Sequence, residues 1–395
     1  MKDSVNKPSE SAIETPVLII GAGPFGLSLA AYLRDLGLDC VVAGDAMRFW
    51  REHMPAGMLL RSGLDWHLDV AEEATLEAFV RECGLDEAVV LPLSRDRYLE
   101  YVAWFMRRKA ADVTPLHVER LARDEGARFV ATCDTGSVTA HAVVVATGFR
   151  DYAVVPEELT AMLPKGAFGH TCEVNDFEAF RGRRVVIVGG RQSAFESAVL
   201  LAEAGARSVD VVYRHATPEF EPSDWSWVEA LMRRTDSDPG WYRALSEPER
   251  TELGTRFWGE GRLKLEPWLA PRLDRPEVRL WPNDRLASAD SRRDGLTLSL
   301  EAGATLEADF VLLATGYRVE VAQVPFLAGS ALLDAIATLD GYPVLDTAMQ
   351  SSVEGLYFTS LAATRDFGAF FGFTVSARSS SKLIGDSLAQ KRNDI

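Results

Sequence analysis

Two stretches of this chain share one pattern, and the repeat constrains the fold more than any other feature. Each consists of an apolar run, a glycine turn and a helix-forming run: "VLIIGAGPFGLSLAAYL" first and "RVVIVGGRQSAFESAVLLA" later. Each is followed further along by an apolar run that closes on Ala-Thr-Gly and an aromatic residue, "AVVVATGFR" and then "FVLLATGYR". The order predicts an α/β fold built from two Rossmann-like dinucleotide-binding units.

The first turn has the spacing of a phosphate-binding loop. The pattern predicts a strand over 16–20, a helix after the turn and a second strand over 40–43. Gly21 permits a tight bend, Gly23 lets the backbone approach a pyrophosphate, and Gly26 lets the helix pack closely on the strand. The N-terminus of the helix then stabilises the negative charge of the phosphates.

An acidic residue is expected at the end of the second strand, where a carboxylate accepts hydrogen bonds from ribose hydroxyls. The chain has Gly44 at that point, and Asp45 follows it. Asp45 is therefore the predicted ribose partner, and an ordinary solvated loop aspartate is the alternative.

The second turn departs from the first because Arg191 stands where the second glycine of the fingerprint is normally found. Gly189 and Gly190 remain for the bend. A long cation at this position either blocks a phosphate or adds a charge-assisted contact to it. The next strand ends in Arg214 and His215, not in the acid that suits an unphosphorylated ribose, and this composition suits a 2′-phosphate. The second unit is therefore predicted to bind NADPH.

The chain continues well past the second Ala-Thr-Gly closure. A strand is predicted near 355–359 and a helix near 373–388, and both are expected to complete the first unit. The second unit is then inserted into the first. The predicted division is a disordered lead-in over 1–14, the first unit over 15–165 and 316–395, and the second unit over 166–315 with a tryptophan-rich helical insert over 218–285.

Composition excludes several classes of function. The 395 residues are 47% hydrophobic and carry a net charge of −16. Acidic and basic residues are interspersed along the chain, which argues against a nucleic-acid or anionic-membrane partner. The four cysteines are scattered without a CxxC pair, so neither a zinc site, a disulfide framework nor a redox-active pair is expected. No signal peptide or membrane span is predicted, because the apolar run over 17–33 is short and broken by glycines. A cytoplasmic protein without a metal is expected.

Further stretches carry a resemblance to a known family. They are "FWREHMPAGMLL" over 49–60, "RDRYLEYVAWF" over 95–105, and "GHTCEVNDFEAFRGRRVVIVGG", in which His170 precedes the second glycine turn. Together with the two turns and their closures, in this order, they resemble the class B flavin monooxygenases, nearest to the branch of ornithine and lysine N-hydroxylases. The resemblance covers nearly the whole chain.

The resemblance implies FAD in the first unit and NADPH in the second. It implies transfer of one oxygen atom from a flavin hydroperoxide to a small-molecule nucleophile, with amine N-hydroxylation preferred. The chain lacks the full linker signature of flavin monooxygenases and Baeyer-Villiger enzymes, and "RDFGAFFGF" over 365–373 replaces the C-terminal His-Gly run of the N-hydroxylases. The alternatives are Baeyer-Villiger oxidation of a ketone, an NADPH-dependent flavin or ferredoxin reductase, and a non-catalytic flavoprotein.

The resemblance also assigns cofactor residues. The predicted FAD-binding residues are Gly21, Gly23, Pro24, Phe25, Gly26, Gly44, Asp45, Trp50, Met58, Arg61, Ala146, Thr147, Gly148 and Phe371. The predicted NADPH-binding residues are Gly189, Gly190, Arg191, Gln192, Ser193, Arg214, His215, Ala314, Thr315 and Gly316. A flavin ring needs an apolar wall, for which Trp50, Trp66 and either Phe370 or Phe371 are the candidates.

Two catalytic candidates lie in the loop "GMLLRSGLDWHLD". Arg61 is predicted to stabilise an anionic flavin, and a salt bridge is the alternative. His67 is a candidate acid or base, and a satisfied core or surface histidine is the alternative. The same alternatives apply to His53 and His170.

The segment 218–285 holds six of the nine tryptophans, namely Trp225, Trp227, Trp241, Trp258, Trp268 and Trp281. It is either a lid over the cleft, an interface between copies of a homo-oligomer, or a structural insert. The expected partners are a small-molecule substrate and molecular oxygen.

Overall fold

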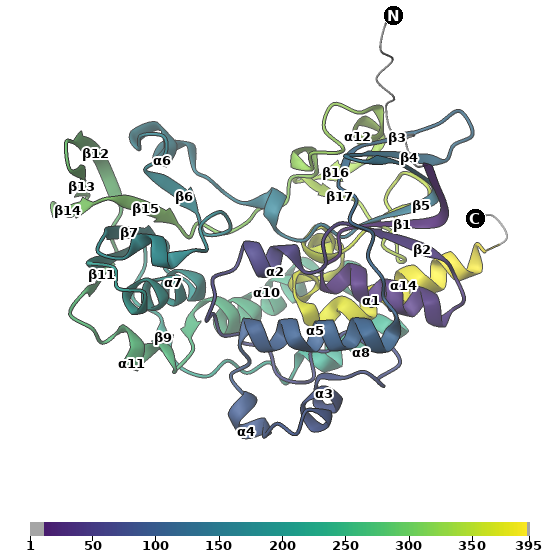
Figure 1. The fold of residues 1–395 in the computed structure, drawn as a ribbon, viewed down its shortest axis with the longest axis horizontal. Helices are drawn as coiled ribbons and strands as arrows, with labels where there is room; N and C mark the ends of the chain where they lie inside the picture. Colours follow the sequence, from purple (N-terminus) through teal and green to yellow (C-terminus); the bar gives the residue numbers. More distant parts are fainter. Residues whose placement is uncertain (1–11, 393–395) are drawn as a thin grey trace, which may run out of the picture.

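The computed structural model describes residues 12–392 and contains two large sheets, which lie on opposite sides of the view in Figure 1. The first sheet has six strands, in the order β2-β1-β5-β4-β3 with β18 paired to β5. Its strands are β1 (Ala12–Ile20), β2 (Cys40–Ala43), β3 (Val118–Arg123), β4 (Phe129–Cys133), β5 (Gly136–Val145) and β18 (Leu356–Phe358).

The first sheet is completed from the C-terminal part of the chain, as the sequence predicts. β18 runs parallel to the end of β5, with Leu356 opposite Val143, while β1 runs parallel to the other edge of β5. One boundary differs. β1 already begins at Ala12, because residues 12–15 pair with the start of β5, so residues 12–14 belong to the sheet and not to a disordered lead-in. Residues 1–11 lie outside the described residues.

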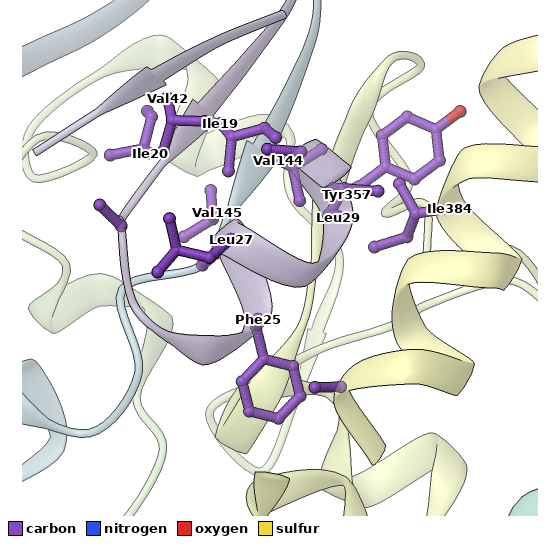
Figure 2. Packing of buried hydrophobic residues seen from close by; sticks show 14 of the residues in the cluster. Ile19, Ile20, Phe25, Leu27, Leu29, Val42, Val144, Val145, Tyr357 and Ile384 are labelled. Carbon is purple, nitrogen blue, oxygen red and sulfur yellow. The ribbon is translucent and has the colours of Figure 1, made fainter. Parts of the chain in front are cut away.

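The first glycine turn leads into α1 (Pro24–Asp35), which is buried along nearly all of its length. Proline suits its first position because that position needs no backbone N–H donor. Figure 2 shows Leu27 of this helix beside Val145 of the sheet, whereas Phe25 points away from the strands toward the C-terminal segment drawn in yellow. α14 (Ala377–Gln390) packs beside α1 and is joined to it by a hydrogen bond from the Tyr32 hydroxyl to Asp386 at 2.6 Å.

The second sheet is parallel throughout, with the order β11-β8-β7-β15-β6. Its strands are β6 (Phe168–His170), β7 (Arg184–Val188), β8 (Ser208–Tyr213), β11 (Val278–Pro282) and β15 (Phe310–Leu313). The second glycine turn leads from β7 into α7 (Gln192–Glu203), which packs on β8. All five strands lie between β5 and β18 in the sequence. The fold therefore has two dinucleotide-binding units, the second inserted into the first.

A small antiparallel sheet and short helices complete the described chain. The antiparallel sheet consists of β12 (Leu286–Arg292), β13 (Gly295–Leu300) and β14 (Thr305–Ala308). The helices of the first unit are α2 (Arg48–Glu52), α3 (Leu76–Glu82), α4 (Glu87–Val90), α5 (Arg95–Lys109), α12 (Ala331–Ala335) and α13 (Thr364–Phe367), with the short pair β16 (Thr338–Leu339) and β17 (Tyr342–Pro343). α6 (Glu157–Met162) instead packs on β12, and its Leu159 belongs to the apolar cluster of the second unit. Within residues 12–392, no helix is long and apolar enough to cross a bilayer.

The tryptophan-rich segment is mostly helical and packs against the first unit. Its elements are β9 (Glu219–Phe220), α8 (Val228–Ser237), α9 (Trp241–Ala244), α10 (Glu247–Arg262), β10 (Lys264–Leu265) and α11 (Leu269–Leu273). Its last predicted residues instead form the edge strand β11 of the second sheet, where Trp281 donates to the buried Asp210. We call the residues 218–273 the insert from here on. Trp227 packs edge-on against Phe370 of the first unit, at 4.9 Å between ring centroids.

Candidate functional site

A cavity of about 820 Å³ lies between the two glycine turns and the insert. Its lining is mostly apolar and includes residues from the first unit, from the start of α7 and from the insert. The predicted FAD-binding residues that line it are Gly21, Gly23, Pro24, Phe25, Gly44, Asp45, Trp50, Met58, Arg61, Ala146, Thr147 and Gly148. The predicted NADPH-binding residues that line it are Arg191, Gln192 and Ser193. Residues predicted for two cofactors thus meet at one cavity.

The first turn has the backbone geometry of a phosphate cradle. Gly21 has a φ of 116°, and a Cβ there would lie 2.4 Å from the carbonyl oxygen of Ala146. A Cβ at Gly26 would lie 2.0 Å from the carbonyl oxygen of Gly21, so this glycine serves helix packing and does not line the cavity. Above Gly23 there is open space, with no atom within 4 Å of a Cβ placed there. This cradle fits the pyrophosphate of a dinucleotide.

Asp45 lines the cavity and belongs to a hydrogen-bonded series of three side chains that the sequence did not suggest. Its Oδ2 lies 2.9 Å from Nε2 of His117, and Nδ1 of His117 lies 3.0 Å from Oδ2 of Asp134. Hydrogen bonds to Asp134 and then to Asp45 raise the pKa of His117. His117 also lines the cavity. One carboxylate oxygen of Asp45 is therefore engaged by a histidine that is far away in the sequence.

The second turn follows the same backbone path as the first. Arg191 is the N-cap of α7, as Gly23 is of α1, and both have extended backbones, so neither position requires glycine for its φ. Gly189 has a φ of 146°, and a Cβ there would lie 2.4 Å from the carbonyl oxygen of Ala314, which mirrors Gly21 and Ala146. Arg191 therefore occupies the place above the helix N-terminus that is open at Gly23.

Arg191 contacts the insert. Its guanidinium carbon lies 5.0 Å from the centroid of the Trp258 ring on α10. Burial, together with the nearby charge of Arg214, lowers the pKa of Arg191. Gly190 is needed for packing, because a Cβ there would lie 2.5 Å from Cβ of Tyr213. The cation thus stands at the edge of the cavity, with an aromatic ring against it.

The other predicted NADPH-binding residues surround the second turn but do not line the cavity. Arg214 is exposed at the end of β8, and His215 follows with Nδ1 2.7 Å from the carbonyl oxygen of Ala216. In the second Ala-Thr-Gly closure, the hydroxyl of Thr315 donates to the carbonyl of Val154, and the carbonyl of Gly316 accepts from Nε2 of His170. Gly189, Gly190, Arg214, His215, Ala314, Thr315 and Gly316 are the residues concerned.

The sequence predicts that Arg61 offers its charge to the cofactor, but in the structure its guanidinium is bonded to other protein groups. Arg61 lines the cavity, but its guanidinium is held by the insert: Nε lies 2.8 Å from Glu266, and the terminal nitrogens donate to the carbonyl oxygens of Gly261 and Glu260 and to Ser223. The salt bridge, the alternative that the sequence left open, is the arrangement observed. Its partners lie 162 to 205 positions further along the chain, a separation that a single sequence does not reveal.

His67 is not at the cavity. It is buried in the first unit, where Nδ1 accepts from the backbone N–H of Asp69 at 3.3 Å. Burial, assisted by the charge of Arg378, lowers its pKa to about 4. Such a neutral, internally bonded histidine is a core residue, so its prediction as a catalytic acid or base is wrong in this fold.

The prediction that Phe371 binds FAD is also wrong. It is fully buried and packs on Phe367, whereas its neighbour Phe370 lines the cavity. Both belong to a single turn of 3-10 helix, Ala369–Gly372, so consecutive side chains point in different directions. Of the other wall candidates, Trp50 and Trp66 do line the cavity. Trp50 is stacked on Tyr98 at 4.6 Å between ring centroids.

His53 and His170 meet at Cys172. Nδ1 of His53 donates to the carbonyl oxygen of Cys172 at 2.6 Å, and Nδ1 of His170 lies 3.1 Å from its Sγ. His53 lines the cavity, and His170 is buried behind it against Tyr317. These contacts connect the predicted linker histidine to the first unit.

Sequence reasoning missed two acids at the cavity, the buried Glu196 and the half-buried Asp151. Glu196 of α7 is 1% exposed and accepts from the backbone N–H of Leu59 at 3.1 Å, and burial raises its pKa. Burial also raises the pKa of Asp151, just after the first Ala-Thr-Gly closure. Both line the cavity. A signal existed for Glu196, because an acid on the otherwise apolar face of "AFESAVLL" breaks the helical pattern.

No cysteine lines this cavity, and the four cysteines of the chain are all unpaired. Cys172 comes nearest, through its contacts with the two histidines. A redox-active disulfide next to a flavin, as a disulfide reductase requires, therefore has no counterpart among the residues that line the site.

A family comparison agrees with the fold and its two turns. Residues 18–235 match the pyridine nucleotide-disulphide oxidoreductase family. The chain belongs to this family. The description of this family implies an oxidoreductase that uses FAD and NAD(P)H. The cradle above Gly23 and the two paired closures are consistent with both.

Curated relatives divide between reductases and monooxygenases. The chain is 30% identical over 225 residues to a ferredoxin–NADP reductase of Burkholderia vietnamiensis, covering 55% of this chain and 56% of the relative. It is 30% identical over 249 residues to an indole-3-pyruvate monooxygenase of Oryza sativa, covering 58% and 57%. The chain thus spans about half the length of the curated relatives it matches.

Solved structures resemble the whole fold. An ornithine N-hydroxylase of Kutzneria sp. 744 has a TM-score of 0.79 and 15% identity, covering 96% of this chain and all of that one. An L-lysine 6-monooxygenase from Pseudomonas syringae has a TM-score of 0.75 and 19% identity, covering 95% and 99%. A bacillithiol disulfide reductase from Bacillus cereus has a TM-score of 0.64 and 21% identity, covering 96% and 99%. At these identities the likeness concerns the fold.

Proposed function

We propose that this chain is an FAD- and NADPH-dependent monooxygenase that hydroxylates the amine nitrogen of a small molecule. The observation that carries the proposal is the single cavity of about 820 Å³ onto which residues of both glycine turns open, walled by aromatic side chains and by no cysteine. Oxygen transfer needs reductant, oxidant and substrate to meet in a space from which water is excluded. The structural resemblance to N-hydroxylases over nearly the whole chain supports the same activity.

In this proposal the first unit, over 15–165 and 316–395, holds FAD. The glycine cradle takes the pyrophosphate, Asp45 takes a ribose hydroxyl with its second carboxylate oxygen, and Trp50 and Phe370 contribute to the wall beside the ring system. When bound and reduced, the flavin supplies the activation of molecular oxygen.

The second unit, over 166–315, holds NADPH. Arg191 caps α7, and burial together with the nearby charge of Arg214 lowers the pKa of Arg191. A phosphate relieves such repulsion by placing negative charge between the two cations. A 2′-phosphate also accounts for Arg214 at the place where an unphosphorylated ribose would need a carboxylate.

The chain's own residues contribute orientation, exclusion of water and control of the proton. An amine attacks an electrophilic oxygen only through its free lone pair, so the ammonium form does not react. An apolar wall disfavours that charged form. Burial raises the pKa of Glu196 and of Asp151, so each holds a proton more tightly than an exposed acid does. In its deprotonated form, either carboxylate is suited to take the proton that the nitrogen loses.

A reductase that passes electrons to ferredoxin is the second candidate, favoured by the curated ferredoxin–NADP reductases that match about half of the chain. The two functions differ in where the electrons go.

The test is to incubate FAD-loaded protein with NADPH and a panel of amines, and to follow NADPH oxidation, oxygen uptake and product mass together. We expect a product heavier than the amine by one oxygen atom, with one oxygen molecule consumed per NADPH at best coupling. If NADPH oxidation is supported by ferredoxin and no amine gains oxygen, the monooxygenase proposal is wrong.

A further inference from the structure

Five aromatic side chains form one continuous cluster in the lining of the cavity. They are Trp66, Trp225, Phe257, Phe370 and Phe373. Ring centroids are 6.3 Å apart for Trp66 and Trp225, 6.0 Å for Trp225 and Phe257, 5.1 Å for Phe257 and Phe370, and 5.8 Å for Phe257 and Phe373. We call these five residues the aromatic cluster.

The aromatic cluster is assembled from opposite parts of the fold. Trp225 and Phe257 come from the insert, whereas Trp66, Phe370 and Phe373 come from the first unit. Because the insert stands outside both sheets, its rings are not needed to build a nucleotide-binding unit. Their position in the cavity lining calls for another occupant, and a large apolar wall favours an apolar one.

The one cation that lies against the aromatic cluster, among the described residues lining the cavity, is already satisfied. The guanidinium carbon of Arg61 lies 5.7 Å from the centroid of the Trp225 ring. Its nitrogens donate to Glu266 at 2.8 Å, to the carbonyl oxygens of Gly261 at 2.7 Å and Glu260 at 3.0 Å, and to Ser223. The negative charge of Glu266 balances its positive charge, so an incoming carboxylate would meet no unmatched cation here.

The other arginines in the lining belong to the nucleotide ends of the cavity. Arg48 pairs with Glu52 at 2.8 Å near Asp45, Arg150 follows the first Ala-Thr-Gly closure, and Arg191 caps the second turn. A substrate held by the aromatic cluster through its body would therefore place a carboxylate in apolar surroundings without a partner, which is strongly unfavourable.

From this geometry we infer the substrate class: a hydrophobic amine without a carboxylate, whose body packs in the aromatic cluster. The inference rests on the proposed function. The reaction is R–NH₂ + O₂ + NADPH + H⁺ → R–NHOH + H₂O + NADP⁺, in which the O–O bond breaks, an N–O bond forms, NADPH is oxidised and the second oxygen atom leaves as water. The apolar wall also keeps the amine uncharged, and so nucleophilic.

Binding of matched probes to the FAD-loaded protein tests this class. Isothermal titration calorimetry would compare tryptamine with tryptophan, phenethylamine with phenylalanine, and 1,5-diaminopentane with lysine. We expect each arylalkylamine to bind at least about tenfold more tightly than its amino acid, because the amino acid buries an unpaired charge, and more tightly than the diamine. Equal or tighter binding of tryptophan or lysine would overturn the inference.

Variants locate the binding. Phe257→Leu keeps the apolar character but removes the ring and its contacts, and we expect about three- to tenfold weaker binding of tryptamine with unchanged FAD content. Trp104→Phe, an aromatic change on α5 outside the cavity, is the matched control and should leave tryptamine binding unchanged. If Phe257→Leu instead loosens FAD and leaves tryptamine binding intact, the aromatic cluster holds the cofactor and the inference fails.

A gain of binding is the strongest check. Glu266→Gln removes the charge that balances Arg61, so tryptophan should bind about fivefold or more tightly than to the unaltered protein, through a new ion pair with its carboxylate. An unchanged tryptophan affinity would contradict the role given to Arg61. Product analysis separates the two proposals: N-hydroxylysine formed in preference to N-hydroxytryptamine overturns only the substrate class, whereas amine binding without any hydroxylated product overturns the monooxygenase proposal.

Discussion

The guanidinium of Arg191 lies over the indole ring of Trp258, with 5.0 Å between its central carbon and the ring centroid. Arg191 caps the helix of the second glycine turn, and Trp258 belongs to the insert. The arginine that breaks the glycine fingerprint is thereby held against a surface that only this insert provides. The second turn and the insert are coupled at the edge of the cavity.

The first prediction concerns Arg191 itself. Arg191→Gly restores the fingerprint but removes a cation from the N-terminus of α7, and we expect the KM for NADPH to rise about tenfold, the size of one charge-assisted contact. FAD content should not change. Arg183→Ala, an arginine outside the cavity, serves as the control. Steady-state kinetics checks the result, and an unchanged KM would mean that the guanidinium does not meet the cofactor.

A smaller effect is expected at Trp258, which is 48% exposed. Trp258→Ala withdraws the ring that orients Arg191, so the KM for NADPH should rise about threefold, in line with an exposed cation–π contact. Leu263→Ala removes another exposed apolar side chain from the end of the same helix and should leave the KM unchanged. Equal effects of the two substitutions would assign the change to the helix and not to the indole ring.

Two glycines of the first turn should separate stability from cofactor binding. Gly26→Ala places a Cβ 2.0 Å from a backbone oxygen, and we expect it to lower the free energy of unfolding by about 2 kcal/mol or more. Gly23→Ala meets no atom within 4 Å, so the fold should stay intact while the methyl group hinders the pyrophosphate and weakens FAD binding about tenfold. Thermal unfolding and flavin absorbance measure the two effects. A Gly23→Ala protein that retains FAD like the unaltered protein would argue against the cradle.

Because the pKa of His67 is lowered in the folded chain, we expect the stability of the protein to depend on pH. Its pKa is about 4 in the folded chain, against an ordinary value of 6.5, so between these values the unfolded chain binds more protons. The stabilising contribution of the neutral form is complete above pH 6.5 and is lost as the pH falls toward 4. Lowering the pH from 7 to 5 should cost about 2 kcal/mol through this group alone.

The measurement for His67 is urea unfolding at pH 7 and pH 5. His67→Asn keeps an acceptor for the backbone N–H of Asp69 but does not titrate. The variant should therefore lose about 2 kcal/mol less than the unaltered protein over the same interval. Parallel losses in both proteins would show that His67 is not held neutral in the folded state.

Local patterns carried the fold prediction. The glycine turn between an apolar strand and a helix is contiguous in the chain, and its physical requirements, a positive φ at Gly21 and close packing at Gly26, restrict residue identity at each position. The return of the chain after the second closure was predictable for the same reason, because an apolar run such as the one that forms β18 must pair with a sheet.

The aromatic residues show where this reasoning ends. Phe370 and Phe371 are adjacent and alike in composition, but only the direction of each side chain from one turn of 3-10 helix decides which lines the cavity. Similarly, the loop that contains Arg61 and His67 mixes polar residues into an otherwise apolar run, which suggests a functional loop, yet its histidine is buried away from the cavity. Side-chain direction in irregular segments is set by tertiary packing and not by periodicity.

The sequence by itself determined two dinucleotide-binding units, their order, the insertion of the second into the first and the residues of each turn, because strand, turn and helix signals act over a few neighbouring residues. Only the tertiary structure decided what the charged side chains meet. Asp45 and His117, Arg61 and Glu266, and Arg191 and Trp258 are brought together by packing between elements that are distant in the chain. Electrostatic and aromatic contacts depend on distance in space, which no local pattern specifies.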